Sequence, residues 1–314
     1  MIAAGCLVQW YEIEMYSEYI NSLVSAIGSN KDKVLIDLCL VTNQELEKVH
    51  NFTIEEIEVN FTTVCSALID KGYNVSFAIV ETLYTIADYR RDFNERYKNK
   101  VEVLFWGESD MLIPSQAIQT ILSLYEGVKD ISPMWLGFFA TCKMWDDSWK
   151  ILEHPKLTDL PRDPYAWYGT RSYMSYDKME EINKDSESPE VIISPEYKFN
   201  GCGLFFSSEL VRAGANIPSS VFFTHEDTGF MNLIKNLFGN STIPFYIVKN
   251  ILLVHNREHP KKRMYVKGEE GRDMNEKRKS NEWYNVASKY SEHNAYTFNT
   301  QQRQYTWKDV WQAL

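Results

Sequence analysis

Two acidic side chains follow a strongly apolar segment of the sequence and are separated by one residue. The segment 101–106 is rich in β-branched and aromatic residues, which predicts a buried strand, and Gly107 interrupts it. Glu108, Ser109 and Asp110 come next. Two carboxylates directed at one point repel each other unless a cation lies between them, and such oxygen ligands suit Mg²⁺ or Mn²⁺. A solvated turn is the alternative, but the apolar flanks favour a site at the mouth of a core strand.

A second pair of acids, Glu226 and Asp227, opens a segment with helical spacing. Acids at a helix start are favoured by the helix dipole, so this pair also has a purely structural explanation. The functional alternative is a catalytic base at the edge of a cleft. His255 follows the apolar segment 244–254 and is a candidate metal ligand, although a surface histidine is the more common case.

Strand-like and helix-like segments alternate along the chain and must position these side chains. The pattern predicts strands at 2–8, 34–42, 75–80, 101–106, 134–144, 204–206 and 244–254, and helices at 15–27, 54–71, 88–98, 116–125, 208–213 and about 225–238. Such alternation is typical of parallel βαβ units. We therefore expect an α/β fold in which helices flank a mixed, mostly parallel sheet, followed by a polar and mostly helical tail.

The composition of the 314 residues indicates a globular chain with a full core, because 44% are hydrophobic and 14% are aromatic. A formal net charge of -10 argues against a general DNA-coating surface, although a local basic groove stays compatible with it. Five dispersed cysteines without a CxxC pair indicate reduced thiols and a cytoplasmic location. No apolar run reaches the ~18 residues of a membrane span, and no signal peptide is expected.

The aromatic-rich segment 145–198 could form an acceptor-facing surface, because aromatic rings stack on flat sugar or base faces. A well-packed excursion without a binding role is the alternative. We take Trp135, Trp167 and Tyr168 as candidate acceptor-binding residues. Gly201 and Gly203 join them, since a glycine permits close backbone approach to a ligand or to another strand. Their Gly-x-Gly spacing is weak evidence for a dinucleotide fingerprint, which needs a third glycine.

The order of these motifs resembles that of the inverting GT-A glycosyltransferases, and family 2 in particular. In that family the first strand ends in a motif that contacts the nucleotide base, which Gln9-Trp10-Tyr11-Glu12 matches, without the usual proline and asparagine. An arginine-containing helix then precedes the metal motif, as Arg90 and Arg91 do here. The acid-x-acid motif is matched by Glu108-Ser109-Asp110, with a glutamate in place of the more usual aspartate.

The resemblance implies a nucleotide-sugar donor, with a UDP-sugar favoured, and Mn²⁺ or Mg²⁺ held by Asp110, Glu108 and His255. It also implies that Arg90 or Arg91 contacts the phosphates and that Asp227, beside Glu226, is the base of an inverting single displacement. Gln9, Tyr11, Glu12 and Ser109 complete the expected donor site. The resemblance covers residues 1–260, with a nucleotide-binding half at 1–114, an acceptor-binding half at 115–260, and a helical extension at 261–314.

The hydroxyl acceptor stays open at this point. One alternative is a glycan, and another is a hydroxymethylated pyrimidine base in DNA, as for a bacteriophage-type enzyme. The basic run 261–263 and the aromatic residues permit the DNA acceptor, whereas the acidic composition disfavours it. A catalytically inactive binding module is a third alternative, against which the intact acids and His255 argue. A nicotinamide-dependent dehydrogenase is disfavoured because no fingerprint follows the first strand.

Overall fold

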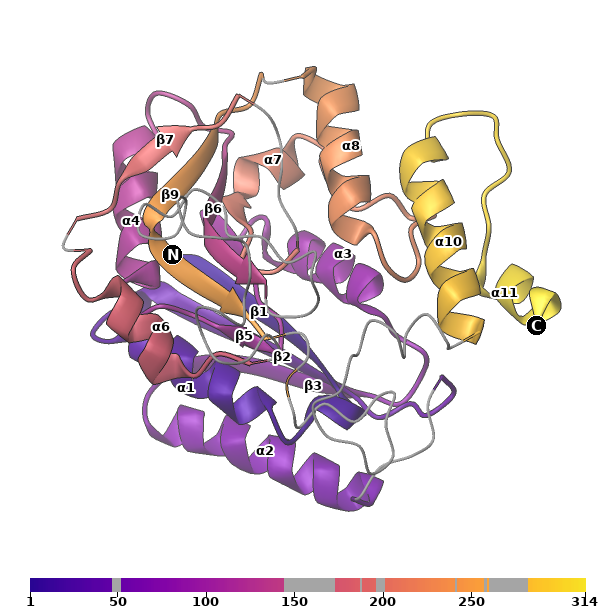
Figure 1. Cartoon of the computed structure of the whole chain (residues 1–314), viewed down its shortest axis with the longest axis horizontal. Helices are drawn as coiled ribbons and strands as arrows, with labels where there is room; N and C mark the ends of the chain where they lie inside the picture. Colours follow the sequence, from indigo (N-terminus) through magenta and orange to yellow (C-terminus); the bar gives the residue numbers. More distant parts are fainter. Residues whose placement is uncertain are drawn as a thin grey trace.

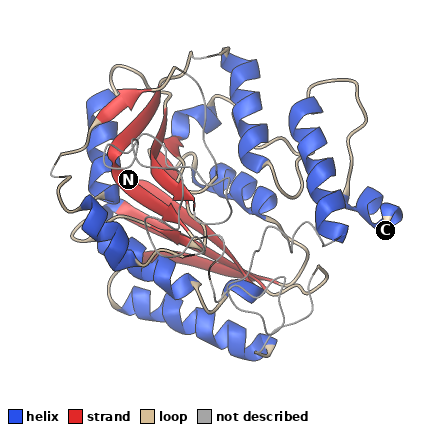
Figure 2. Cartoon of the chain, viewed as in Figure 1, coloured by secondary structure: helices blue, strands red, loops and turns tan. Residues whose placement is uncertain are grey.

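The computed structural model describes residues 1–46, 52–143, 173–186, 188–195, 201–240, 242–256, 259 and 282–314. In these ranges nine strands form one sheet in the order β3-β2-β1-β4-β8-β6-β9-β5, with β7 paired to β9 (Figures 1 and 2). The strands are β1 (Ile2–Gln9), β2 (Val34–Val41), β3 (Asn74–Val80), β4 (Val103–Trp106), β5 (Met111–Leu112), β6 (Leu136–Lys143), β7 (Val191–Ile193), β8 (Phe205–Ser207) and β9 (Phe245–His255).

The sheet is mostly parallel. β1 pairs in parallel with β2 and β4, β2 with β3, and β6 with β9. β8 lies antiparallel between β4 and β6, so β6 and β9 run in the same direction as β4. The short strands β5 and β7 pair antiparallel to β9. The carboxyl ends of the parallel strands therefore share one edge of the sheet, which is where open α/β sheets bind their ligands.

Helices cover both faces of the sheet (Figure 1). One face carries α1 (Tyr16–Ile27), α2 (Ile54–Asp70) and α4 (Ala117–Val128), and the other carries α3 (Ile86–Tyr97), α7 (Ser208–Arg212) and α8 (Glu226–Phe238). α6 (Tyr176–Asn183) packs against β9, and α10 (Glu282–Thr297) packs against α8, followed by α11 (Trp307–Ala313). Short 3₁₀ helices lie at Trp10–Glu12 (η1) and Lys31–Lys33 (η2). No helix in the described ranges is long and apolar enough to span a bilayer.

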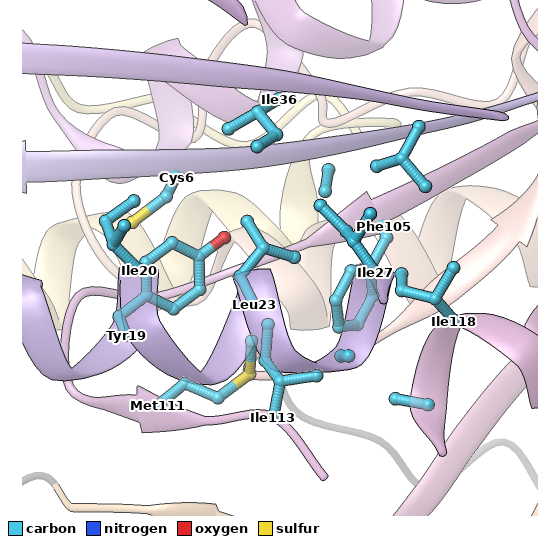
Figure 3. Packing of buried hydrophobic residues seen from close by; sticks show 14 of the residues in the cluster. Cys6, Tyr19, Ile20, Leu23, Ile27, Ile36, Phe105, Met111, Ile113 and Ile118 are labelled. Atoms are coloured by element: carbon cyan, nitrogen blue, oxygen red, sulfur yellow. The ribbon is translucent and has the colours of Figure 1, made fainter. Parts of the chain in front are cut away.

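Side chains of the central strands alternate between two cores, as the period of two in a strand requires. In β1, Ala4 and Cys6 belong to the core under α1, whereas Ala3 and Leu7 belong to the core under α3. Figure 3 shows the first core from close by, with Tyr19, Leu23 and Ile27 of α1 directed at Ile36 of β2 and Phe105 of β4. Each large apolar side chain buried in this way contributes about 1.5–3 kcal/mol.

A buried carboxylate fixes α3, the helix that carries Arg90, onto the sheet. Asp37 lies in β2 and is 1% exposed. Its oxygens accept hydrogen bonds from Tyr89 Oη at 2.8 Å, Tyr97 Oη at 2.6 Å and Arg96 Nη1 at 2.8 Å, all from α3. A buried charge needs such partners, because unpaired burial is costly. The orientation of α3 is thereby set relative to β1 and β4.

The α/β architecture expected from the sequence is confirmed, including every strand and helix placed by periodicity up to residue 143. Three short elements, β5, β7 and α6, were not expected, because each is too brief to show periodicity. The motif at residues 9–12, which follows the first strand, contains the 3₁₀ turn η1. Within the aromatic segment, residues 144–172 lie outside the described ranges.

Candidate functional site

The acids Glu108 and Asp110 lie in the tight connection between β4 and β5. The amide of Met111 donates to the carbonyl of Glu108 at 3.0 Å, which closes the turn. β5 pairs antiparallel to β9 with Met111 opposite His255, so the register brings the histidine to the acids. His255 Nε2 lies 3.1 Å from Glu108 Oε2 and 3.3 Å from Asp110 Oδ1. The three candidate metal ligands named from the sequence therefore converge.

A fourth side chain, Cys202, reaches the same point. Its thiol sulfur, a carboxylate oxygen of Glu108 and a ring nitrogen of His255 lie within 4.8 Å of one another. The pairing of β8 with β4 explains this position. Phe105 faces Phe205, and beyond the strands Gly203 N still donates to Trp106 O at 2.9 Å. Continuing that register carries Cys202 to the level of Glu108.

The donor set fits a divalent cation, because it offers carboxylate oxygen, imidazole nitrogen and a thiol. Burial would raise the pKa of Glu108, but His255 and Arg90 outweigh it and hold the pKa at about 2. Burial lowers the pKa of His255, whereas Cys202, Asp110 and Glu108 raise it well above its ordinary value. Burial also raises the pKa of Cys202 to about 11. The carboxylates thus create a potential that favours positive charge between them.

Arg90 joins this cluster to the second pair of acids. Its side chain is 1% exposed, and Nη2 donates to Glu108 Oε1 at 2.9 Å and to the carbonyl of Gly201 at 2.8 Å. Nη1 pairs with Glu226 Oε1, and the guanidinium lies 4.8 Å from the centre of the Trp106 ring. A buried arginine that bridges two carboxylates fixes both of them, because breaking such a pair leaves an uncompensated charge.

Arg91 is directed elsewhere. It donates to the carbonyls of Ile217 and Pro218, each at 3.1 Å, to the carbonyl of Val221, and to Asp88 Oδ1 at 3.1 Å. These contacts hold the chain that leads into α8. Of the two arginines predicted to bind phosphate, only Arg90 contacts the acids of the site, Glu108 and Glu226.

Glu226 and Asp227 occupy different environments at the start of α8. Glu226 is 8% exposed, and burial is the main cause that raises its pKa to about 7, with Asp227 and Glu108 adding to the effect and Arg90 opposing it. Asp227 is half-buried, accepts from Gly201 N at 3.1 Å through Oδ2, and accepts from its neighbour's amide at 2.7 Å through Oδ1. Only the second acid therefore combines a fixed orientation with access to solvent.

The turn into these acids adopts a strained conformation and is held from the side. His225, the residue before them, has a φ of 63°, in the left-handed region that costs about 1–2 kcal/mol for an L-residue. On α10, Ser291 Oγ donates to Thr224 O at 2.6 Å and accepts from Phe223 N at 3.2 Å. On the same helix, Asn294 Nδ2 donates to Ser220 O at 2.6 Å. The tail thus fixes the segment 220–224, and neither residue was expected from the sequence.

The expected nucleotide-binding residues lie in and before η1, at the carboxyl end of β1. Glu12 Oε2 accepts from Ser109 Oγ at 2.7 Å and from Gln9 N at 3.1 Å. Gln9 Nε2 donates to Tyr84 O at 3.2 Å, and Tyr11 is partly exposed. Ser109 is therefore directed at η1, and its hydrogen bond joins the motif at the end of the first strand to the acid-x-acid motif.

The expected acceptor residues divide into three groups. Gly201 lies against Arg90 and Glu226, and Gly203, with a φ of 82°, approaches Leu253, so both lie at the site. Trp135 is 0% exposed and packs on Phe205 with ring centres 6.0 Å apart. Trp135 precedes the first residue of β6, whereas His255 pairs with the last residue of β6. The length of the strand therefore separates Trp135 from His255 by roughly 25 Å. The Trp135 ring fills the core, so its position gives no support to the acceptor role expected for it. Trp167 and Tyr168 lie outside the described residues.

Cys202 is the site residue that the sequence did not reveal. Its flanking glycines indicate only a close backbone approach, and its partner Glu108 is far away along the chain. The pairing of β8 with β4 is a tertiary feature, which no local pattern reports. Cys6, Cys39 and Cys65 are also buried thiols, but among the described residues the group that could hold a metal ion contains Cys202 and none of these three.

Comparisons with known proteins give likenesses in structure alone. No protein-family model matches the sequence, and no curated protein matches it significantly. TarS of S. aureus is 11% identical with a TM-score of 0.49, over 83% of this chain and 37% of the TarS chain. Glucosyl-3-phosphoglycerate synthase of Mycobacterium tuberculosis, in complex with Mn²⁺ and UDP-glucose, is 11% identical with a TM-score of 0.42, over 93% of this chain and 78% of that chain. The galactosyltransferase LgtC is 12% identical with a TM-score of 0.38, over 77% and 72% of the two chains.

This chain thus spans little more than a third of the full TarS chain. At these identities and TM-scores the likenesses concern the general arrangement of strands and helices. The topology of the chain itself confirms the α/β architecture implied by its resemblance to the GT-A glycosyltransferases of family 2.

Proposed function

We propose that this chain is a glycosyltransferase that moves a sugar, in the simplest case a hexose, from a nucleotide-sugar to an acceptor hydroxyl. A UDP-sugar is the favoured donor. One observation carries the proposal, namely the convergence of Glu108, Asp110 and His255 on one point, joined through Arg90 to the acids that open α8. Cation ligands and a candidate base on neighbouring segments are the two parts that metal-assisted group transfer needs.

The donor would lie across the carboxyl ends of β1 and β4. Gln9, Tyr11 and Glu12 surround the end of β1 and are proposed to hold the nucleotide, with Ser109 fixing Glu12. Glu108, Asp110 and His255 are proposed to hold Mn²⁺ or Mg²⁺ against the diphosphate. A bound divalent cation supplies Lewis-acid neutralisation of the charge that develops on the departing diphosphate.

The main role proposed for Arg90 is to position the carboxyl groups of Glu108 and Glu226. Its Nη1 pairs with Glu226, and its Nη2 donates to Glu108 and to the carbonyl of Gly201, so it orients the acids on both sides. Its positive charge also favours the diphosphate electrostatically at short range. Arg91 has no direct role, because its donors serve the segment 217–221.

Asp227 is the proposed base. Its carboxylate takes the proton of the acceptor hydroxyl while the hydroxyl oxygen forms a bond to the anomeric carbon. The bond from that carbon to the diphosphate oxygen breaks on the opposite face, and its electron pair leaves with the diphosphate, so the anomeric centre inverts. Partial exposure and the hydrogen bond from Gly201 N support Asp227 over Glu226, which is buried and paired with Arg90.

Thermal melting tests the donor site. A ligand that binds only the native state raises the melting midpoint. At one hundred times its Kd it adds about 2.7 kcal/mol to the free energy of unfolding. We expect a shift with one nucleotide-sugar of a panel of UDP-, GDP-, CDP- and ADP-sugars, a larger shift with Mn²⁺, and loss of the metal-dependent part in Asp110→Ala. Asp130→Ala, which removes an exposed acid beyond α4, is the matched control.

Sugar transfer is then measured with the same variants. Asp227→Asn should bind the donor with unchanged affinity and transfer sugar at least about a hundredfold more slowly. Full transfer activity in Asp227→Asn would exclude it as the base. A melting response to no nucleotide would instead indicate a glycan-binding module.

A further inference from the structure

The Gly201-Cys202-Gly203 segment faces the acid motif across an extension of the β4–β8 ladder. Three backbone contacts fix it in place. Gly203 N donates to Trp106 O at 2.9 Å, Trp106 N donates to Leu204 O at 2.8 Å, and Arg90 donates to the carbonyl of Gly201 at 2.8 Å. These anchors hold the backbone of Cys202 at the level of Glu108.

We propose that Cys202 is a protein ligand of the donor-site cation, together with Glu108 and His255, and that its sulfur makes the site prefer borderline ions such as Co²⁺ and Zn²⁺ to Mg²⁺. This inference rests on the proposed function for the role of the cation. It adds a ligand that the acid-x-acid motif does not contain.

The geometry of the three donor atoms is close to what such an ion needs. They lie within 4.8 Å of one another. A tetrahedral Zn²⁺ with a sulfur at about 2.3 Å and a nitrogen at about 2.0 Å separates these two atoms by roughly 3.5 Å. Rotamer adjustments of about 1 Å in Cys202 and His255 would close that difference, while Arg90 holds Glu108 in place through a hydrogen bond of 2.9 Å.

The donor types also differ from a magnesium site. Mg²⁺ takes oxygen ligands and keeps several waters, whereas thiolate and imidazole favour zinc and the later transition metals. Cys202 is 0% exposed and His255 is 6% exposed, while the partial exposure of Glu108 leaves one side open. With Asp110 also at the cluster, any position that a bound ion keeps for the donor lies on the side of Glu108. The thiol loses its proton to solvent when its sulfur binds the ion.

Cobalt absorption provides the test, with the reduced full-length protein and Co²⁺ alone as the probe. A bond between thiolate sulfur and Co²⁺ produces an intense near-ultraviolet charge-transfer band, whereas oxygen and nitrogen ligands alone do not. We expect this band in the wild type and in Cys65→Ser, whose cysteine lies on α2 away from the site. In Cys202→Ser the band should vanish, and the affinity for Co²⁺ should fall by about tenfold or more, with little change for Mg²⁺.

The wild-type spectrum decides the question even if Cys202→Ser folds poorly. Binding of Co²⁺ without a charge-transfer band would overturn the inference, and so would unchanged affinity in a folded Cys202→Ser. Failure of the wild type to bind Co²⁺ would overturn it as well. Melting shifts with a nucleotide-sugar in the absence of metal would then show that the donor site exists without this ligand, which separates failure of the inference from failure of the proposed function.

Discussion

At the scale of single residues, the site depends on the absence of a side chain at position 201. A Cβ on Gly201 would collide with the guanidinium of Arg90 and lie 2.8 Å from Glu226 Oε1. Arg90 is buried and bound on three sides, so it has no room to withdraw. Gly201 does not have the positive φ that requires a glycine at position 203. Its close contact with the arginine is therefore what requires a glycine at position 201.

Gly201→Ala should consequently lower both stability and activity. Displacing the buried arginine exposes two acids to each other, which we expect to cost about 3 kcal/mol and most of the transfer activity. Gly127→Ala is the matched control, since nothing lies within 4 Å of its added Cβ in α4, and it should be neutral or stabilising by about 0.5–1 kcal/mol. Urea unfolding of both variants measures the difference, and equal stability of the two would contradict the collision.

Glu226 makes stability depend on pH. Its folded-state pKa of about 7 is raised from an ordinary value of 4.5, so the folded chain binds this proton more tightly than the unfolded chain does. The resulting stabilisation is complete below about pH 4.5 and is lost as the pH rises through 7, over a range of up to about 3 kcal/mol. In Glu226→Gln this loss should disappear, so its free energy of unfolding should fall less between pH 4.5 and 7 than that of the wild type. Asp130→Asn should retain the wild-type slope, and a wild-type slope in Glu226→Gln would refute the raised pKa.

At the scale of elements, helix α10 supports the segment that leads to Asp227, the proposed base. Ser291 and Asn294 are both 0% exposed and hydrogen-bond the backbone of the segment before α8. Phe222 and Phe223 of that segment pack against aromatic residues of α10 and α11. The left-handed His225 follows directly, so the tail stabilises a conformation that the turn does not favour on its own.

Ser291→Ala should therefore alter the position of the segment that leads to Asp227. Loss of two buried hydrogen bonds should cost about 1–3 kcal/mol of stability. We also expect a several-fold lower kcat with an unchanged KM for the donor, because the donor residues lie on η1 and the β4–β5 turn while the base lies beyond the weakened segment. Glu292→Ala, an exposed neighbour on the same helix, is the control. An equal rise in KM with unchanged kcat would contradict this division of roles.

The elements and the site were predictable to different extents. The helix at 54–71 and the strand before Gly107 could be predicted, because burial of one face or of a whole strand leaves a hydrophobic pattern in the local sequence. The spacing of Glu108 and Asp110 likewise indicated two carboxylates at one point, which the structure places beside His255. The orientation of Arg91, the burial of Trp135 and the arrival of Cys202 depend on which distant segments pair, and this information is not contained in any local window of sequence.

At the scale of the whole molecule, the formal charge of -10 bears on the acceptor. A duplex with one negative charge per ~1.7 Å of axis is repelled by an acidic surface beyond a local contact. We therefore expect a saccharide acceptor, and no retention of the chain on hydroxymethylated DNA at physiological salt. Filter binding across a salt series measures this. Tight retention that weakens steeply as salt rises would contradict the expectation and favour the DNA acceptor.

The proposed ligands of the cation are distributed along the chain in an order that matters during synthesis. Glu108 emerges first, Cys202 almost a hundred residues later, and His255 only with the end of β9. The thiol meets the carboxylate through the pairing of β8 with β4. A nascent chain therefore cannot assemble these three ligands before β9 has left the ribosome, and cation binding would report that the last central strand has docked.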